Sequence, residues 1–199
     1  MPSLHADIER VLFPEDLILE GIDRVARAIV ERFDGRDFTV VSILKGSCIF
    51  SADLIRRIPV PLELAFVSAS SYRDKTTSGE LEISFFPTGE IEGRNLLLVD
   101  DILDTGQTMS RLKEEFLRRG ANEVATCVFL DKPSRRAVEL DADFKVLEVE
   151  DLFVVGYGLD FNGRYRNLPY VGVLRPELYG AAEEELGRDA DEPETSEAR

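Results

Sequence analysis

The sequence contains one histidine, His5, two cysteines and no tryptophan. A single histidine near the start of the chain argues strongly against a histidine base in catalysis. It also argues against a zinc site, which draws its ligands from several histidines and cysteines. Cys48 and Cys127 lie far apart and form no C-x-x-C motif. A disulfide between them is conceivable, but the absence of a secretion signal favours two reduced thiols.

Long apolar runs are also missing. No stretch approaches the 18 apolar residues that a membrane-spanning helix needs. Residues 1–10 lack the basic block and the apolar block of a signal peptide. We therefore expect a soluble, cytoplasmic protein with no membrane partner.

Positive charge is scarce, with 24 lysines and arginines against 39 acidic residues and a net charge of −15. Extended contact with nucleic acid is not expected, because such contact depends on clustered basic residues. Part of the excess is local, since residues 181–199 hold eight acids and two arginines and almost no apolar side chains. We expect one domain over residues 1–180 and an acidic, disordered tail over 181–199, for which a regulatory role stays open.

What the chain does have is 44% apolar residues over 199 positions, enough for one real core. Helical spacing after Pro14 predicts a helix that ends at Asp34-Gly35, and two further helices are predicted over about 48–57 and 105–119. Apolar runs predict strands at 38–44, 62–69, 81–86, 96–99, 124–130, 144–149 and 153–156. Strands that alternate with helices predict an α/β fold, with a central, mostly parallel sheet flanked by helices.

The densest chemical signal is the segment 96–108, LLLVDDILDTGQT. A buried strand delivers Asp100 and Asp101 at its carboxyl end, which is the usual ligand edge of an open α/β sheet. A short turn with Thr105 and Gly106 then opens into a helix, whose free amides and dipole suit a phosphate group. Each residue alone could simply cap a turn or a helix; the combination favours phosphate binding. The chain has neither a Walker motif nor G-x-G-x-x-G after a strand, which disfavours ATPases and Rossmann enzymes.

This segment resembles the 5-phosphoribosyl 1-diphosphate (PRPP) motif of type I phosphoribosyltransferases. Further stretches resemble the hypoxanthine–guanine branch of that family: LKG at 44–46, SY at 71–72, DKPSRR at 131–136, FVVGYGLD at 153–160 and RYRNLPY at 164–170. The resemblance runs in unbroken order over roughly residues 12–174. It implies the type I phosphoribosyltransferase fold, with a small hood and a mobile loop.

The resemblance assigns PRPP to one group of residues. Backbone amides over Asp104, Thr105, Gly106, Gln107 and Thr108 would hold the 5′-phosphate, and Lys45 and Gly46 would form the pyrophosphate loop. Asp100 and Asp101 would bind the ribose hydroxyls directly or through Mg²⁺, and Asp160 would bind a second Mg²⁺ with Arg166 as its charge partner. Some family members have a peptide in the cis form before the lysine, which the sequence cannot reveal.

The resemblance assigns the purine to a second group. Asp104 would accept the proton from N7, Lys132 would donate to O6, Phe153 would stack on the ring, and Val154 would offer backbone groups to its edge. The chain has five lysines against 19 arginines, so lysine is not its default cation at a surface position. Ser71 and Tyr72 would belong to a loop that closes over the site and excludes water.

The function implied is a Mg²⁺-dependent glycosyltransferase of purine salvage. It would transfer 5-phosphoribosyl from PRPP to N9 of hypoxanthine, and of guanine as well, giving IMP or GMP and pyrophosphate. A homodimer or homotetramer is expected. Another type I phosphoribosyltransferase, for xanthine, adenine or a pyrimidine, is one alternative; a regulator that binds nucleic acid through this fold is another.

Overall fold

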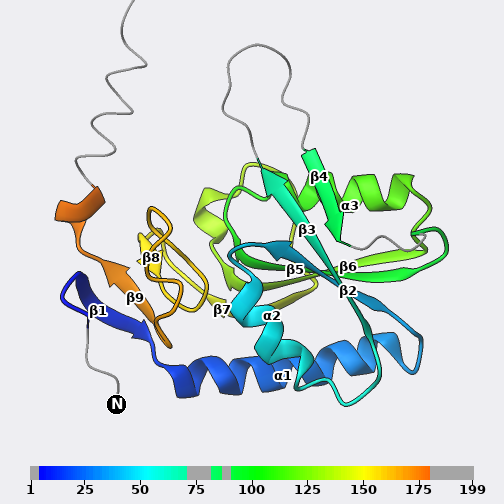
Figure 1. Cartoon of the computed structure of the whole chain (residues 1–199), viewed down its shortest axis with the longest axis horizontal. Coiled ribbons are helices and arrows are strands. Elements are labelled where there is room, and N and C mark those ends of the chain that lie inside the picture. The colour runs from blue at the N-terminus through cyan, green and yellow to red at the C-terminus, as the bar shows by residue number, and fades with distance from the viewer. Residues whose placement is uncertain (1–4, 71–81, 87–90, 180–199) are drawn as a thin grey trace, which may run out of the picture.

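The computed structural model describes residues 5–70, 82–86 and 91–179. Most of them form a six-stranded sheet with helices on both faces, and a smaller sheet lies at one end (Figure 1). The strands of the large sheet are β2 (Thr39–Leu44), β3 (Glu63–Ser70), β4 (Glu82–Phe86), β5 (Asn95–Leu103), β6 (Glu123–Asp131) and β7 (Phe144–Glu148). The helices are α1 (Glu15–Phe33), α2 (Cys48–Ile55), α3 (Gln107–Arg118) and the 3₁₀ turn η1 (Pro133–Arg135).

The large sheet has the strand order β4-β3-β2-β5-β6-β7. All neighbours run parallel except β4, which is antiparallel to β3. The predicted α/β class and mostly parallel sheet are confirmed. Because the parallel strands end at one edge, the loops after β2, β5 and β6 meet there, and this is where such sheets bind ligands.

Both faces of the central strands are buried, which is typical of strands with uninterrupted apolar runs. On β5, Leu97 and Val99 belong to the core under α1 and α2, whereas Leu96 and Leu98 belong to the core under α3. Figure 1 shows α1 and α2 on one side of the sheet and α3 on the other. Strand β3 is less buried: Leu64 is 37% exposed, because the pairing with β4 begins only at Phe66.

Two predicted elements around the densest motif have different bounds in the structure. The strand predicted over 96–99 runs from Asn95 to Leu103, so Asp100 and Asp101 lie within β5, and Asp100 is opposite Val128 of β6. The helix predicted from Thr105 begins at Gln107, because Gly106 has a φ of 82° and lies outside the helix. The loop between β5 and α3 is therefore only Asp104 to Gly106.

The smaller sheet, which we call the hood, contains β1 (Ile8–Phe13), β9 (Val171–Leu174) and β8 (Val154–Val155), in the order β1-β9-β8. All its pairings are antiparallel, with Ile8 opposite Leu174. The sequence patterns indicated neither β1 nor β9. The strand predicted over 153–156 is only two residues long, because Gly156 has a φ of 101° and turns the chain.

Two expectations from the composition can be compared with the structure. Cys48 is exposed and Cys127 is buried, and both thiols are free, as predicted. In the described ranges, 5–70, 82–86 and 91–179, no helix has the length and apolarity needed to cross a membrane.

Candidate active site

The loop after β5 lies beside the 3₁₀ turn after β6, and an arginine holds the two together. Arg136 donates through Nη1 to the carbonyl oxygens of Leu103 (2.9 Å) and Asp104 (2.8 Å) and forms an ion pair with the buried Asp131. Gly106 of the same loop packs against the segment after η1, since a Cβ on Gly106 would lie 2.8 Å from Val138 Cγ2. The carbonyls of the loop are therefore satisfied from the β6 side.

The start of α3 has no side-chain cap, because its N-cap residue is Gly106. The nearest side chain is that of Thr105, whose hydroxyl lies 3.4 Å from the amide nitrogen of Gln107, a weak hydrogen bond. Uncapped amides and the positive end of a helix dipole form an environment for an anion. The site residues Asp104, Thr105, Gly106, Gln107 and Thr108 that were predicted for a phosphate all lie on this loop and first turn.

Asp100 and Asp101 place two carboxylates side by side near the end of β5. Burial raises the pKa of Asp100 well above its usual range, and the adjacent negative charge of Asp101 raises it further. Burial also raises the pKa of Asp101, against hydrogen bonds from Asp100 and the Ile102 amide and the positive charge of Arg166. The pair thus lacks sufficient positive charge around it, and a cation would relieve the repulsion.

The turn after β2 packs directly on this acidic pair. Gly46 is buried, and a Cβ on it would lie 1.6 Å from Asp101 Oδ2, so any larger residue would displace the Asp101 carboxylate. The preceding Leu44–Lys45 peptide is cis, and Lys45 is exposed. Ser47 anchors the turn from below by donating to the Ile43 carbonyl (2.5 Å) and bonding the Ser42 hydroxyl (2.7 Å).

The segment after β8 covers the same turn from the hood side. A Cβ on Gly158 would lie 2.1 Å from the Gly46 carbonyl oxygen, so the two backbones touch. Arg166 donates to the Gly158 carbonyl (2.6 Å) and pairs with Asp160 (2.6 Å). The structure thus brings Gly46, Asp101 and the Asp160–Arg166 pair into one cluster.

A second cluster connects the phosphate-side loop to the predicted purine side. Arg135 Nε lies 3.2 Å from Asp104 Oδ1, and its Nη1 lies 3.5 Å from Asp151 Oδ1. The same Asp151 oxygen lies 3.5 Å from Lys132 Nζ. Four charged groups therefore alternate in sign from Asp104 to Lys132. Among the described side chains, Asp104 Oδ1 is one of three buried polar atoms without a hydrogen-bond partner.

Lys132 is only 7% exposed, which is unusual for a lysine. Its ammonium donates to the Leu152 carbonyl (2.9 Å), which directly precedes Phe153 in the chain. An ammonium has three N–H donors, so a further acceptor can be served.

Phe153 lies partly buried at the hood. Tyr179 stacks on its ring at a centroid distance of 4.7 Å, and Phe161 meets it edge-on at 5.4 Å. Val154 belongs to β8, which pairs only with β9 in the hood and so is an edge strand. The ring is held from two sides, and backbone groups on the outer side of β8 are not used by the sheet.

Sequence reasoning missed Arg135, Arg136 and Asp151 as members of the site. The stretch 131–136 contains two adjacent arginines, and nothing in their spacing distinguishes the one that holds the loop carbonyls from the one that faces Asp104. Ser71 and Tyr72, predicted for a closing loop, and the predicted tail lie outside the described residues.

The predicted metal ligands do not form one cage. In the part of the chain that the structure describes, no group of three or more His, Cys, Asp and Glu side chains could hold a metal ion. The pair Asp100–Asp101 nevertheless fits Mg²⁺, because it offers hard oxygen donors with unrelieved negative charge. Mg²⁺ usually takes one or two carboxylates and completes its shell with water and substrate phosphates.

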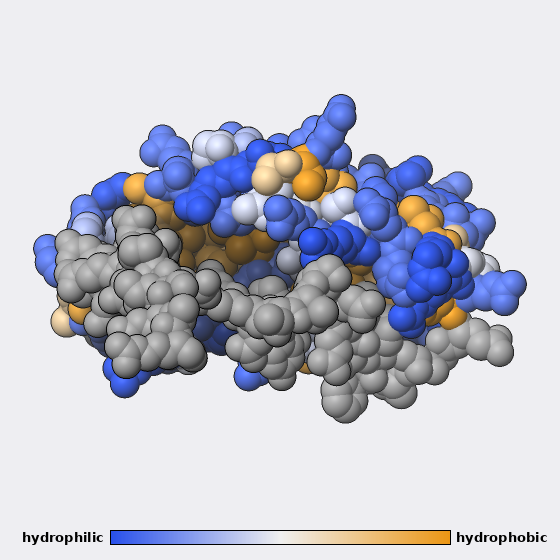
Figure 2. Space-filling model, turned by 90° about the horizontal axis from the view of Figure 1, so that it is seen from above, coloured by the Kyte–Doolittle hydropathy of each residue, from blue (hydrophilic) through white to orange (hydrophobic). Residues whose placement is uncertain are grey.

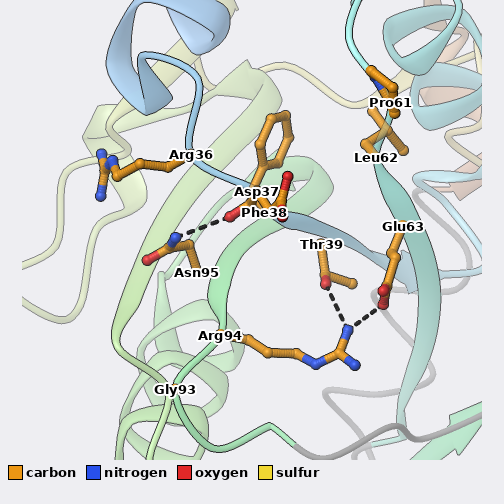
Figure 3. A pocket seen from close by; sticks show the side chains of 10 residues that line it. All are labelled: Arg36, Asp37, Phe38, Thr39, Pro61, Leu62, Glu63, Gly93, Arg94 and Asn95. Carbon is orange, nitrogen blue, oxygen red and sulfur yellow. Dashed lines mark hydrogen bonds and ion pairs between the residues drawn. The ribbon is translucent and has the colours of Figure 1, made fainter.

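Seen from above, the molecule has a depression with an apolar floor, bordered along its upper side by mainly hydrophilic residues (Figure 2). A separate cavity of about 670 Å³ is lined by ten residues at the opposite edge of the sheet, where β2, β3 and β5 begin (Figure 3). There, Arg94 is paired with Glu63 and Asn95 donates to the Asp37 carbonyl (2.9 Å). This cavity lies at the end of the sheet opposite to Asp100, Asp101 and the start of α3, so it is not the candidate active site.

Comparison with known proteins agrees with this geometry. Residues 12–162 match the phosphoribosyl transferase domain family. The chain is 42% identical to the hypoxanthine-guanine phosphoribosyltransferase of Streptococcus pneumoniae, over 88% of this chain and 98% of that protein. It is 42% identical to the Bacillus subtilis enzyme of the same name, over 87% and 97%. It also matches the bifunctional protein TilS/HprT of Listeria monocytogenes with 43% identity, spanning 89% of this chain but only 28% of that relative's length.

Solved structures give the same result. Hypoxanthine phosphoribosyltransferase from Trypanosoma cruzi in complex with the product IMP superposes with a TM-score of 0.83 at 36% identity, covering 89% of this chain and all of that one. The Staphylococcus aureus hypoxanthine phosphoribosyltransferase has a TM-score of 0.81 at 37% identity, with coverage of 90% and 98%. The chain belongs to the type I phosphoribosyltransferase family, in its hypoxanthine–guanine branch.

Proposed function

We propose that this protein transfers the 5-phosphoribosyl group of PRPP to N9 of hypoxanthine, and of guanine, releasing pyrophosphate and giving IMP or GMP. The observation that carries the proposal is the alternating charge chain from Asp104 through Arg135 and Asp151 to Lys132. It links a loop suited to a phosphate with a buried ammonium next to a fixed aromatic ring. A phosphorylated sugar and a purine with an oxygen acceptor would meet between them.

On the sugar side, the amides over Asp104 to Thr108 bind the 5′-phosphate. Arg136 supports this by holding two carbonyls of the loop, which leaves the amides of the first turn of α3 for the ligand. Asp100 and Asp101 bind the ribose hydroxyls or hold Mg²⁺. When bound, the ion neutralises charge on PRPP and on the departing pyrophosphate.

On the leaving-group side, Lys45 and the backbone of Gly46 bind the diphosphate of PRPP. Asp160 is connected to this turn, because it pairs with Arg166, which bonds Gly158, and Gly158 packs on Gly46. This connection supports a role for Asp160 at a second Mg²⁺. The departing pyrophosphate carries negative charge that must be stabilised as the bond to C1′ breaks.

On the purine side, Phe153 stacks on the base and Val154 offers backbone groups to its edge. Lys132 donates to O6, and this selects oxopurines because an ammonium finds no acceptor at the 6-amino group of adenine. Asp104 accepts the proton from N7. Its carboxylate lies 3.2 Å from Arg135, and its negative charge stabilises the proton on N7 until that proton is transferred to it.

The other candidate functions have less support. Adenine is disfavoured by Lys132, and xanthine would require a partner for its 2-oxo group that we do not locate. A regulator that binds nucleic acid requires a basic face, whereas the net charge is −15.

The test is a PRPP- and Mg²⁺-dependent assay with hypoxanthine, guanine, xanthine and adenine side by side. Formation of IMP and GMP, with adenine a poor substrate, is the expected result. Turnover of xanthine or of adenine instead would reassign the base, and absence of any PRPP-dependent product would refute the proposal. Binding of DNA or RNA at moderate salt would favour the regulator.

Assembly and location belong to the proposal as well. We infer a homodimer or homotetramer located in the cytoplasm. Light scattering of the purified full chain measures the first, and fractionation of the source cells measures the second.

A further inference from the structure

Helix α2 begins directly after the turn Lys45–Ser47 and is joined to the hood side by one tyrosine. Tyr157 donates its phenolic hydrogen to Asp53 Oδ2 on α2, with an O···O distance of 2.5 Å. Asp53 also pairs with Arg56 and Arg57 of the same helix end. No other hydrogen bond described for residues 5–70, 82–86 and 91–179 links α2 to the segment 153–174. The contact joins two parts of the chain that are 104 residues apart.

Tyr157 occupies the centre of a compressed Gly-Tyr-Gly turn. A Cβ on Gly156 would lie 2.0 Å from the Tyr170 carbonyl oxygen, and one on Gly158 would lie 2.1 Å from the Gly46 carbonyl oxygen. Tyr157 itself has a φ of 51°, a region that non-glycine residues rarely occupy. A strained residue of this kind persists only where its surroundings hold it in place.

The Tyr157 side chain is tightly packed in a largely apolar environment. The residue is 3% exposed, and its ring packs against Phe129 at a centroid distance of 5.0 Å. Burial and the Asp53 charge raise the pKa of Tyr157, so the phenol stays protonated and remains a donor. Arg57 extends the connection to α1 through Asp23 (2.7 Å). The hydroxyl is therefore anchored to the body of the protein.

On the other side, the turn carries the groups that face the candidate diphosphate site. The Gly158 amide donates to the Arg166 carbonyl (2.9 Å), and Arg166 returns a bond to the Gly158 carbonyl and pairs with Asp160. Any shift of Tyr157 therefore moves Gly158 against Gly46, together with the Asp160–Arg166 pair.

We propose that Tyr157 and Asp53 are a positioning pair, which holds the Gly158–Arg166 unit against the Lys45–Gly46 turn and so preorganises the binding of the diphosphate. Neither residue touches substrate. The inference rests on the proposed function, because it assigns the turn to the diphosphate of PRPP. If it is correct, loss of the Tyr157–Asp53 bond weakens the binding of ligands that contain a diphosphate and leaves the binding of the nucleotide product, which contains none, unchanged.

The test measures equilibrium binding by calorimetry for wild type and Tyr157→Phe, with Mg²⁺-PRPP, Mg²⁺-pyrophosphate and IMP as ligands. Tyr165→Phe is the matched control, because Tyr165 also has a positive φ and donates to an aspartate, but that aspartate is Asp7 (2.7 Å) near the N-terminus and not a residue of α2. We expect the Kd values of PRPP and pyrophosphate to rise on the order of tenfold in Tyr157→Phe, the scale of one hydrogen bond to a charged group. IMP binding should change by less than about twofold on the same scale.

A second variant, Asp53→Asn, keeps an oxygen acceptor for the hydroxyl. PRPP and pyrophosphate should therefore bind Asp53→Asn more tightly than they bind Tyr157→Phe. If the melting temperature of Tyr157→Phe reveals a folding defect, Asp53→Asn still tests the bond. Equal weakening of IMP and PRPP, or no change in either, would overturn the positioning role. If wild type binds neither PRPP nor IMP, the proposed function itself fails, and that outcome differs from both.

Discussion

Replacing Lys132 with alanine is the sharpest test of base recognition. The ammonium lies in a nearly closed environment, 7% exposed, and is oriented by the Leu152 carbonyl at 2.9 Å and by Asp151 at 3.5 Å. Both partners lie on the proposed purine side of the site, close to Phe153 in the chain. Because the ammonium is already oriented, its bond to O6 costs little additional ordering.

The expected loss follows from that environment. A hydrogen bond from a charged donor in a largely dry pocket contributes about 1.5–3 kcal/mol, which corresponds to roughly 10- to 150-fold in kcat/KM for hypoxanthine. Adenine has no O6 and should lose less. The free energy of unfolding should fall by about 1–3 kcal/mol, since the Leu152 carbonyl loses its donor. The lost pair with Asp151, which is 56% exposed, should add at most about 1 kcal/mol.

The assay compares kcat/KM for hypoxanthine, guanine and adenine at saturating PRPP, and the Kd of PRPP by calorimetry, below the melting temperature of the variant. Lys113→Ala is the control, a lysine of α3 that pairs with Asp143 only at 3.9 Å. We expect the ratio of oxopurine to aminopurine use to fall in Lys132→Ala and to stay constant in the control. If PRPP affinity fell as much as hypoxanthine use, Lys132 would be a phosphate-side or structural residue, and the reasoning would be wrong.

Three further variants test the rest of the site. Asp104→Asn should keep the fold and nucleotide binding but lower kcat by at least about 10²-fold, the scale of lost acid–base catalysis; near-normal turnover would remove Asp104 from the chemistry. Gly46→Ala should abolish PRPP binding, because its Cβ would overlap Asp101 Oδ2 at 1.6 Å; a variant with normal PRPP affinity by calorimetry would contradict the packing. Without metal at pH 8, Asp100→Asn should raise the unfolding free energy by about 1 kcal/mol, and with it the melting temperature, while weakening the binding of Mg²⁺-PRPP. The pKa of Asp100 is raised in the folded state, so its ionisation opposes folding as pH rises, and the gain should shrink towards pH 5; a gain that grows on acidification would refute this sign.

Much of the layered fold could be predicted from local patterns. The apolar spacing and the Asp34-Gly35 stop predicted α1 to the residue at its C-terminal end, and the uninterrupted apolar run of β5 predicted a buried strand. Such patterns carry this information because helical and strand periods follow from backbone geometry, and both are visible within a dozen residues. The segment 96–108 likewise shows its chemistry locally, since carboxylates, turn and helix start are consecutive.

The rest depended on partners that are distant in sequence. The hood forms because Ile8 pairs opposite Leu174, and no local pattern specifies a partner so far along the chain. The same holds for the charge chain through Arg135 and Asp151 and for the Tyr157–Asp53 bond. The sequence by itself determined the three helices, the strands of the large sheet and the consecutive carboxylates, turn and helix start of the segment 96–108. Only the tertiary structure decided which charges meet, because ion pairs and hydrogen bonds act over a few ångströms of space and leave no period in the chain.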